Sequence, residues 1–229
     1  DNFFRPYPGY ANVTLTDNAY SSNYNALLVS LNRRFTAGLQ IGVSYTYSKY
    51  LDYTGNSANG STSGNGVSSN VPVYLPLRTW AYGFDAADQT HNLVINYSYQ
   101  APRLTSNKLL GFVANDWLIS GVTQFVSGLP QAVTFTTVSG ADLTGGGDGQ
   151  RVNVVGDGSM NGKDFYHWFN PAAFALPAIN TPGNAGKFNF RQPGVANWDM
   201  AVSKRFPIAS EKRFLQFRWE AYNTFNHTQ

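Results

Sequence analysis

Residues 39–48, LQIGVSYTYS, decide the fold of this chain. Every second position in this stretch is apolar, and the positions between are small or polar. The apolar positions are Leu39, Ile41, Val43, Tyr45 and Tyr47. Because successive side chains of a β-strand point to opposite faces, this alternation predicts a strand with one apolar and one polar face.

The same alternation recurs along the chain and predicts six strands in all. These are Tyr24–Phe35, Leu39–Leu51, Asn92–Tyr99, Trp117–Val126, Trp198–Phe206 and Phe214–Phe225. Both faces of Trp117–Val126 are mixed in character, so the sequence does not orient this strand. Lys204 interrupts the apolar face of its strand near the end. A helical period in the last segment would place Arg218 and Glu220 in the apolar stripe, which argues for a strand there as well.

The connections between these strands follow a pattern of lengths. The order is short, long, moderate, long and short, with the tight turn at Thr36–Gly38 and two long loops, 52–88 and 129–197, rich in Gly, Ser and Asn. Antiparallel neighbours alternate sides, so the short links fall on one side and the long loops on the other. Short periplasmic turns and long extracellular loops are typical of an antiparallel transmembrane β-barrel, whereas a soluble sandwich has no reason to separate them. The sequence therefore predicts an all-β chain that forms part of such a barrel.

Composition agrees with a membrane location and excludes several functions. Charged residues make up 13% of the chain, about half of the roughly 25% of a soluble domain. No run of about 18 apolar residues occurs, so we expect no transmembrane helix. The net charge of +3 comes without a Lys/Arg run, which argues against nucleic acid as a partner. The chain has no cysteine, and its three histidines lie far apart in the sequence, so we expect no enzymatic activity and no cofactor.

The two predicted faces give two sets of candidate residues. In lipid, backbone polar groups must be satisfied within the protein, so only helices and closed barrels span the membrane. We expect the apolar face to contact outer-membrane lipid and the polar face to line an aqueous lumen. The expected lumen-facing residues are Gln40, Ser44, Asn96, Gln216, Arg218 and Glu220. The expected aromatics of the membrane interface are Tyr45, Tyr47, Tyr97, Tyr99, Trp198 and Trp219.

The second long loop holds two further candidates. Tyr166, Trp168 and Phe169 either contact a ligand or pack together as a small loop core. Asp157, Ser159 and Asn161 resemble the start of a calcium loop, but the twelfth position of that loop is Trp168 in place of the usual glutamate. We therefore expect a plain polar turn and no metal site there.

Several stretches in order along the chain resemble the C-terminal barrel region of Oar-like TonB-dependent receptors of the acidobacterial type. They read RPYPGY (5–10), SNYNAL (22–27), SLNRRF (30–35), YTYSK (45–49), FVSGLP (125–130), WFNPAAF (168–174), QFRWE (216–220) and YNTFNHTQ (222–229). The resemblance implies a plugged barrel of about 22 strands in the bacterial outer membrane. It also implies an N-terminal carboxypeptidase-regulatory-like domain, a plug domain and a TonB-like energy-coupling partner.

Six strands are fewer than the usual minimum of about eight. We therefore expect residues 1–229 to form a single partial barrel domain of a longer protein that imports or exports an unidentified bulky solute. Two alternatives stay open. The chain could belong to a surface adhesin or self-assembling structural protein, or it could be a soluble β-rich carbohydrate-binding domain.

Overall fold

The computed structural model describes residues 7–10, 21–53, 76–135, 150–164, 166–179, 181–208 and 210–227. Most of the Gly-, Ser- and Asn-rich parts of the two long links lie outside the described residues. The same holds for the first residues of the chain and for its last two.

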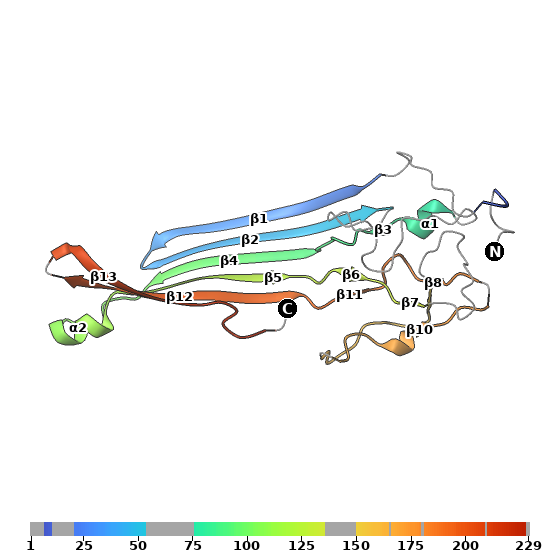
Figure 1. Ribbon diagram of the computed structural model, residues 1–229. Coiled ribbons are helices and arrows are strands. Elements are labelled where there is room, and N and C mark those ends of the chain that lie inside the picture. Colours follow the sequence, from blue (N-terminus) through green and yellow to red (C-terminus); the bar gives the residue numbers. More distant parts are fainter. Residues whose placement is uncertain are drawn as a thin grey trace. The chain divides into compact units, whose positions relative to one another are not determined.

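Six long strands form one antiparallel sheet in which each strand pairs with the next long strand along the chain (Figure 1). They are β1 (Asn23–Thr36), β2 (Leu39–Asp52), β4 (His91–Gln100), β5 (Trp117–Val126), β12 (Val195–Ile208) and β13 (Ser210–Ala221). All six predicted strands are confirmed. Four of them are longer by a few residues than the alternation indicated, and β5 has the predicted bounds. β13 begins earlier than predicted and ends at Ala221, so the predicted extension to Phe225 is wrong, because the chain turns after Ala221. In the part of the chain that the structure describes, the sheet is open, with β1 and β13 at its edges.

The links contain only short elements. β3 (Gly83–Phe84) pairs with β2, and three two-stranded ladders join β6 (Pro130–Gln131) to β11 (Phe190–Arg191), β7 (Thr134–Phe135) to β8 (Gln150–Arg151), and β9 (Asn153–Val154) to β10 (Phe174–Ala175). The helices are α1 (Leu77–Ala81), α2 (Lys108–Ala114) and the 3-10 helix η2 (Pro171–Ala173). None of the described helices is long and apolar enough to cross a bilayer.

The pairing register puts the apolar positions of neighbouring strands on one face. Val43 lies opposite Ile95, and Ile95 lies opposite Thr123. Thr123 in turn lies opposite Trp198. The same register orients β5, which the sequence left open, because Ile119, Thr123 and Phe125 fall on the apolar face with these residues. The residues between them, among them Ser120 and Gln124, fall on the polar face.

Among the described residues, no second layer covers most of this apolar face. The buried apolar side chains of the described residues are Trp80, Ala81, Ala86, Val126, Val152, Ala173 and Ala185, and none of them belongs to it. Large side chains on the face are half-buried or exposed, and Leu31, Leu215, Phe217 and Trp219 are among the exposed ones. An uncovered apolar sheet face of this size suits contact with lipid rather than water.

The chain divides into two compact units. The first unit comprises residues 1–25, 48–90 and 128–193, and the second comprises residues 26–47, 91–127 and 194–229. The long links fall in the first unit, whereas most of the six-stranded sheet and all the shorter links fall in the second. The predicted asymmetry of link lengths is therefore reflected in the folding units.

A tight two-residue turn joins β1 to β2. Ala37 and Gly38 both have positive φ, at 52° and 82°, as a type I′ hairpin turn requires. A Cβ atom on Gly38 would lie 2.5 Å from the carbonyl oxygen of Gln100. The carbonyl oxygen of Gly38 accepts a hydrogen bond from the Gln100 backbone N–H at 2.7 Å. The turn therefore needs glycine for both its conformation and its contact with the end of β4.

Candidate functional site

The six polar residues expected to face a lumen lie on one face of the sheet. Gly42 lies opposite Asn96, and Arg205, Ser203 and Ala201 lie opposite Gln216, Arg218 and Glu220. All six candidate residues, Gln40, Ser44, Asn96, Gln216, Arg218 and Glu220, are exposed to solvent. Most of the residues opposite them on neighbouring strands have small side chains, among them Ser98, Gly42, Ser203 and Ala201. The face is therefore polar, with many small side chains. That it lines a lumen stays a prediction.

Arg218 and Glu220 neutralise each other along the strand. The Arg218 Nε lies 2.5 Å from Glu220 Oε1, and the Tyr222 hydroxyl donates to Glu220 Oε2 at 3.0 Å. The residues opposite them on β12 are Ser203 and Ala201, which carry no charge. A recess of about 260 Å³ opens beside this pair and is lined by Val122 and Asp199 among others. Because both side chains are exposed, the ion pair contributes little to the stability of the protein. Its main effect is that the two opposite charges cancel on this face.

The aromatic residues expected at the membrane interface lie on the opposite, apolar face. Tyr99 lies opposite Leu39 beside the short turn, and Tyr47 lies opposite His91 at the other end of the same ladder. Tyr45 donates to or accepts from His91 Nδ1 at 2.8 Å, and Trp219 lies opposite Val202. Tyr97 lies opposite Ile41, and Trp198 lies opposite Thr123. The assignment of the six residues to interface belts stays a prediction.

The aromatic segment of the second long link packs mostly against its own unit. The Trp168 indole N–H donates to the Arg191 carbonyl at 2.5 Å. The Phe169 ring stacks on Phe190 with centroids 4.7 Å apart and contacts Phe174 edge-on at 5.7 Å. Tyr166 is exposed over 85% of its surface, so its ring is accessible to an outside molecule. The geometry therefore favours the loop core for Trp168 and Phe169.

The weak calcium candidate forms a polar turn. The two carboxylate oxygens of Asp157 accept from the Ser159 N–H at 2.8 Å and from the Ser159 hydroxyl at 2.6 Å. These bonds hold the pKa of the exposed Asp157 carboxyl below its usual value. Asn161 is exposed, and among the described residues no group of three His, Cys, Asp or Glu side chains is arranged to hold a metal ion.

The structure reveals a set of buried charges that the sequence did not indicate. We call Asp52, Asp85, Asp88, Lys187 and Arg191 the long-link charge cluster, since all five belong to the unit that contains the long links. The side chains of Asp85 and Asp88 are essentially inaccessible to solvent. Burial of this many charges is costly unless each is paired or hydrogen-bonded.

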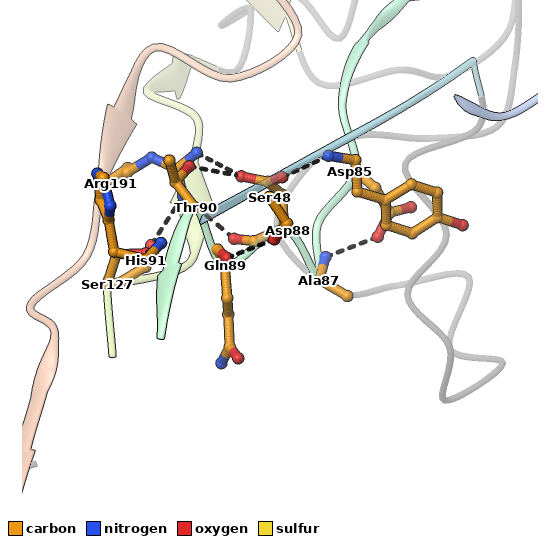
Figure 2. A network of polar contacts seen from close by, with 11 residues as sticks. Ser48, Asp85, Ala87, Asp88, Gln89, Thr90, His91, Ser127 and Arg191 are labelled. Carbon is orange, nitrogen blue, oxygen red and sulfur yellow. Dashed lines mark hydrogen bonds and ion pairs between the residues drawn. The ribbon is translucent and has the colours of Figure 1, made fainter. Parts of the chain in front are cut away.

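Asp88 and Arg191 form one half of this cluster (Figure 2). Arg191 Nη2 lies 2.5 Å from Asp88 Oδ2, which also accepts from the Thr90 hydroxyl at 3.0 Å. The other oxygen of Asp88 accepts from the Tyr50 N–H at 2.6 Å. Arg191 also donates to the carbonyls of Asp88 and Gly128, at 3.1 and 3.0 Å. The pair therefore ties the end of β2, the residues just before β4 and the segment after β5 to β11.

Lys187 and Asp52 form the other half. The Lys187 ammonium donates to Asp52 Oδ1 and, at 3.1 Å, to the Asp52 carbonyl, with side-chain exposures of 1% and 7%. Asp85 Oδ1 accepts from the Ala87 N–H at 2.7 Å, whereas its second oxygen is buried without a hydrogen-bond partner. Burial raises the pKa of Asp85, and the nearby Asp52 charge raises it further. Burial also lowers the pKa of Lys187, against the effect of Asp52.

The cluster is suited to holding the long links in place, not to chemistry on a substrate. Its two ion pairs, Lys187 with Asp52 and Arg191 with Asp88, are formed within the protein and connect segments far apart in the sequence, whereas Asp85 keeps one carboxylate oxygen without a partner. One signal was available in the sequence, because a chain with only 13 acidic residues places Asp85 and Asp88 three apart just before a strand. Arg191, which lies in the second long link, is the main partner of Asp88.

An antiparallel sheet with one uncovered apolar face, one polar face and long links gathered in a separate unit defines a class, the membrane-spanning β-barrel. Comparison with protein families supports this class directly. The model of the outer membrane beta barrel domain family matches residues 1–229, and the chain belongs to that family. It is accordingly a protein of the bacterial outer membrane. Comparisons with curated proteins and with solved structures gave no match.

Proposed function

We propose that the chain is part of a TonB-dependent receptor that moves a bulky solute across the outer membrane, of the Oar-like kind that its sequence resembles. In this proposal the longer protein supplies the remaining strands, a plug domain and the contact with a TonB-like energy-coupling protein. The chain itself supplies barrel wall and long links, and it has no catalytic role.

The observation that carries the proposal is the small size of the residues on the polar face. A barrel of about eight strands has an interior just wide enough for its own side chains to fill. Here the face offers Ser44, Ser98 and Ala201 where a small barrel would need larger side chains. A wall lined in this way suits a wide barrel whose lumen holds water or a plug.

The open edges of the sheet support the same conclusion. β1 and β13 each pair with one neighbour among the described strands, so each presents a row of unpaired backbone groups. In hydrocarbon such groups cost several kcal/mol each, on the order of the penalty for any unsatisfied polar group. Further strands must therefore cover both edges in the membrane, as a barrel larger than six strands provides.

Uptake and adhesion assays in the source bacterium test the proposal. The gene is deleted, and cells are assayed with labelled oligosaccharides and metal chelates as probes, with and without a protonophore. We expect uptake of at least one probe to fall in the deletion strain, and the same uptake to stop in the wild type when the proton gradient collapses. Unchanged uptake of the probes with lost attachment to surfaces would replace the proposal with the adhesin function.

Detergent dependence tests the remaining alternative. We expect the purified protein to stay monodisperse only in detergent or lipid, since its apolar sheet face is uncovered. A protein that is monodisperse in plain buffer and binds an immobilised polysaccharide would instead be a soluble carbohydrate-binding domain.

A further inference from the structure

α2 presents apolar side chains to the outside although it is firmly fixed. Leu109, Leu110 and Val113 are exposed over 85%, 62% and 65% of their surfaces. The Asn107 side chain caps the helix by accepting from the N–H groups of Leu109 and Leu110. A rigid helix that exposes several large apolar residues marks a contact surface.

The link that carries α2 is held together by Asn115. The Asn115 side chain accepts from the N–H groups of Leu104 and Thr105, at 2.8 and 3.2 Å, and donates to the Thr105 carbonyl at 2.8 Å. The Trp117 indole N–H donates to the Val113 carbonyl at 2.9 Å. The exposed apolar residues therefore sit on a built structure and not on a loose loop.

The same link folds over the apolar face of the sheet. Lys204 lies opposite Trp117 and Phe217, which places it on that face. Its ammonium donates to the Asn115 carbonyl and lies over the Trp117 and Phe206 rings, and the residue is only 2% exposed. This explains how a cation is tolerated on an apolar face, because a backbone carbonyl and aromatic rings compensate its charge.

Phe112 makes the surface of α2 continuous with the sheet. Its ring lies 5.0 Å from that of Phe206, which belongs to the apolar face. A recess of about 530 Å³ between the link and the end of β12 is lined by Arg103, Lys108, Lys204 and Arg205, with Asp116 as the one acid. The Lys204 ammonium is buried and Arg205 lies on the polar face, so the cations of this recess that can reach lipid phosphates are the exposed Arg103, which lies 3.8 Å from Asp116, and Lys108. Together with the apolar patch beside them, these cations match the phosphate groups and acyl chains of a phospholipid leaflet.

We propose that α2 is an interfacial helix, which inserts Leu109, Leu110 and Val113 into the leaflet at the short-link end of the barrel while the neighbouring cations bind lipid phosphates. This surface adds to the transport function and does not depend on it, because it requires only that the barrel stands in a membrane.

Fluorescence quenching tests the insertion. The chain has no cysteine, so Leu110→Cys provides a unique site for an environment-sensitive dye. The protein is reconstituted in vesicles of phosphatidylethanolamine and phosphatidylglycerol. We expect a blue-shifted emission, strong quenching by lipids with a nitroxide near the headgroup, and quenching by iodide several-fold weaker than at a water-facing control site.

Two further dye positions serve as controls for the emission and quenching at residue 110. Ile179→Cys carries the dye on an exposed apolar residue of the long links, and Leu31→Cys carries it on the apolar face of β1. Iodide quenching at residue 110 equal to that at residue 179, without nitroxide quenching, overturns the proposal. Val113→Cys repeats the test should the first variant fail to fold.

Charge neutralisation tests the contact with phosphate. For the unmodified recess we expect nitroxide quenching at residue 110 to rise with the fraction of phosphatidylglycerol. In the Arg103→Gln, Lys108→Gln background this dependence is expected to be lost. An unchanged dependence on phosphatidylglycerol in that background overturns the assignment of these cations to lipid phosphates.

Discussion

Lysine placed on the two faces of β2 gives the sharpest test of how the sheet stands in the membrane. Val43 and Ser44 are neighbours in the chain but lie on the apolar and the polar face. Val43→Lys puts an ammonium in hydrocarbon, whereas Ser44→Lys puts the same group in an aqueous lumen. The two substitutions share backbone, strand and charge, so each is the control for the other.

The size of the effect follows from the position of Val43. Leu39 and Tyr47 mark the ends of the β2–β4 ladder, and Val43 lies midway between them. At about 3.3 Å per residue the ladder is about 26 Å long. A strand tilt of about 40° reduces this to roughly 20 Å of bilayer depth. Val43 therefore lies near the midplane, where lysine costs about 2–4 kcal/mol, against about 0–1 kcal/mol at Leu39 or Tyr47.

Urea unfolding of the protein in phospholipid vesicles measures these differences. We expect Val43→Lys to lower the free energy of unfolding by about 2–4 kcal/mol. We expect Ser44→Lys to change it by no more than about 0.5 kcal/mol. Leu39→Lys and Tyr47→Lys should give small losses on either side of a central maximum. Equal losses at Val43 and Ser44, or a larger loss at Ser44, would refute the orientation of both faces.

Three further predictions concern the links. Lys187→Met leaves Asp52 buried without its cation and should lower the free energy of unfolding by about 3–5 kcal/mol, part of which the added Asp52→Asn change should restore. Burial raises the pKa of Asp85, so ionisation of this carboxyl opposes folding above that pKa. Asp85→Asn should therefore stabilise the protein at neutral pH, as measured by urea unfolding. The gain in stability should vanish below pH 3.8, the ordinary pKa of an aspartate side chain, and a gain that persists there would exclude this cause. Gly38→Ala strains a positive φ and clashes with the Gln100 carbonyl, so it should cost at least about 1–3 kcal/mol, and a neutral result in thermal unfolding would contradict the turn geometry.

The strands were predictable from the sequence because period-two alternation is local. The stretch 39–48 carries its faces in its own residues, and the register of β2 with β4 confirms them. β5 could not be oriented in this way, because Gly121 and Thr123 occupy its apolar face and Val122 its polar face. The orientation of β5 follows only from its pairing, in which Gly121 lies opposite Tyr97 of β4 and Val122 lies opposite Asp199 of β12.

The charge cluster and α2 could not be predicted because their partners are remote or their signals short. Arg191 pairs with Asp88 across 103 residues, and Lys187 pairs with Asp52 across 135. No local pattern reports such contacts. α2 has seven residues and depends on the cap by Asn107, a feature that does not stand out from the surrounding polar link.

The hairpin turn at Gly38 limits where the chain can change in length. The turn already has the minimum of two central residues. The Gly38 carbonyl oxygen also accepts a hydrogen bond from the N–H of Gln100 at the end of β4. An added residue in the turn would shift β1 by one position against β2 and exchange the lipid and water faces of β1. The long links have no such restriction around Ile179, which projects into solvent. A peptide tag for display on the bacterial surface therefore belongs at Ile179, and one inserted at Gly38 would abolish assembly of the hairpin.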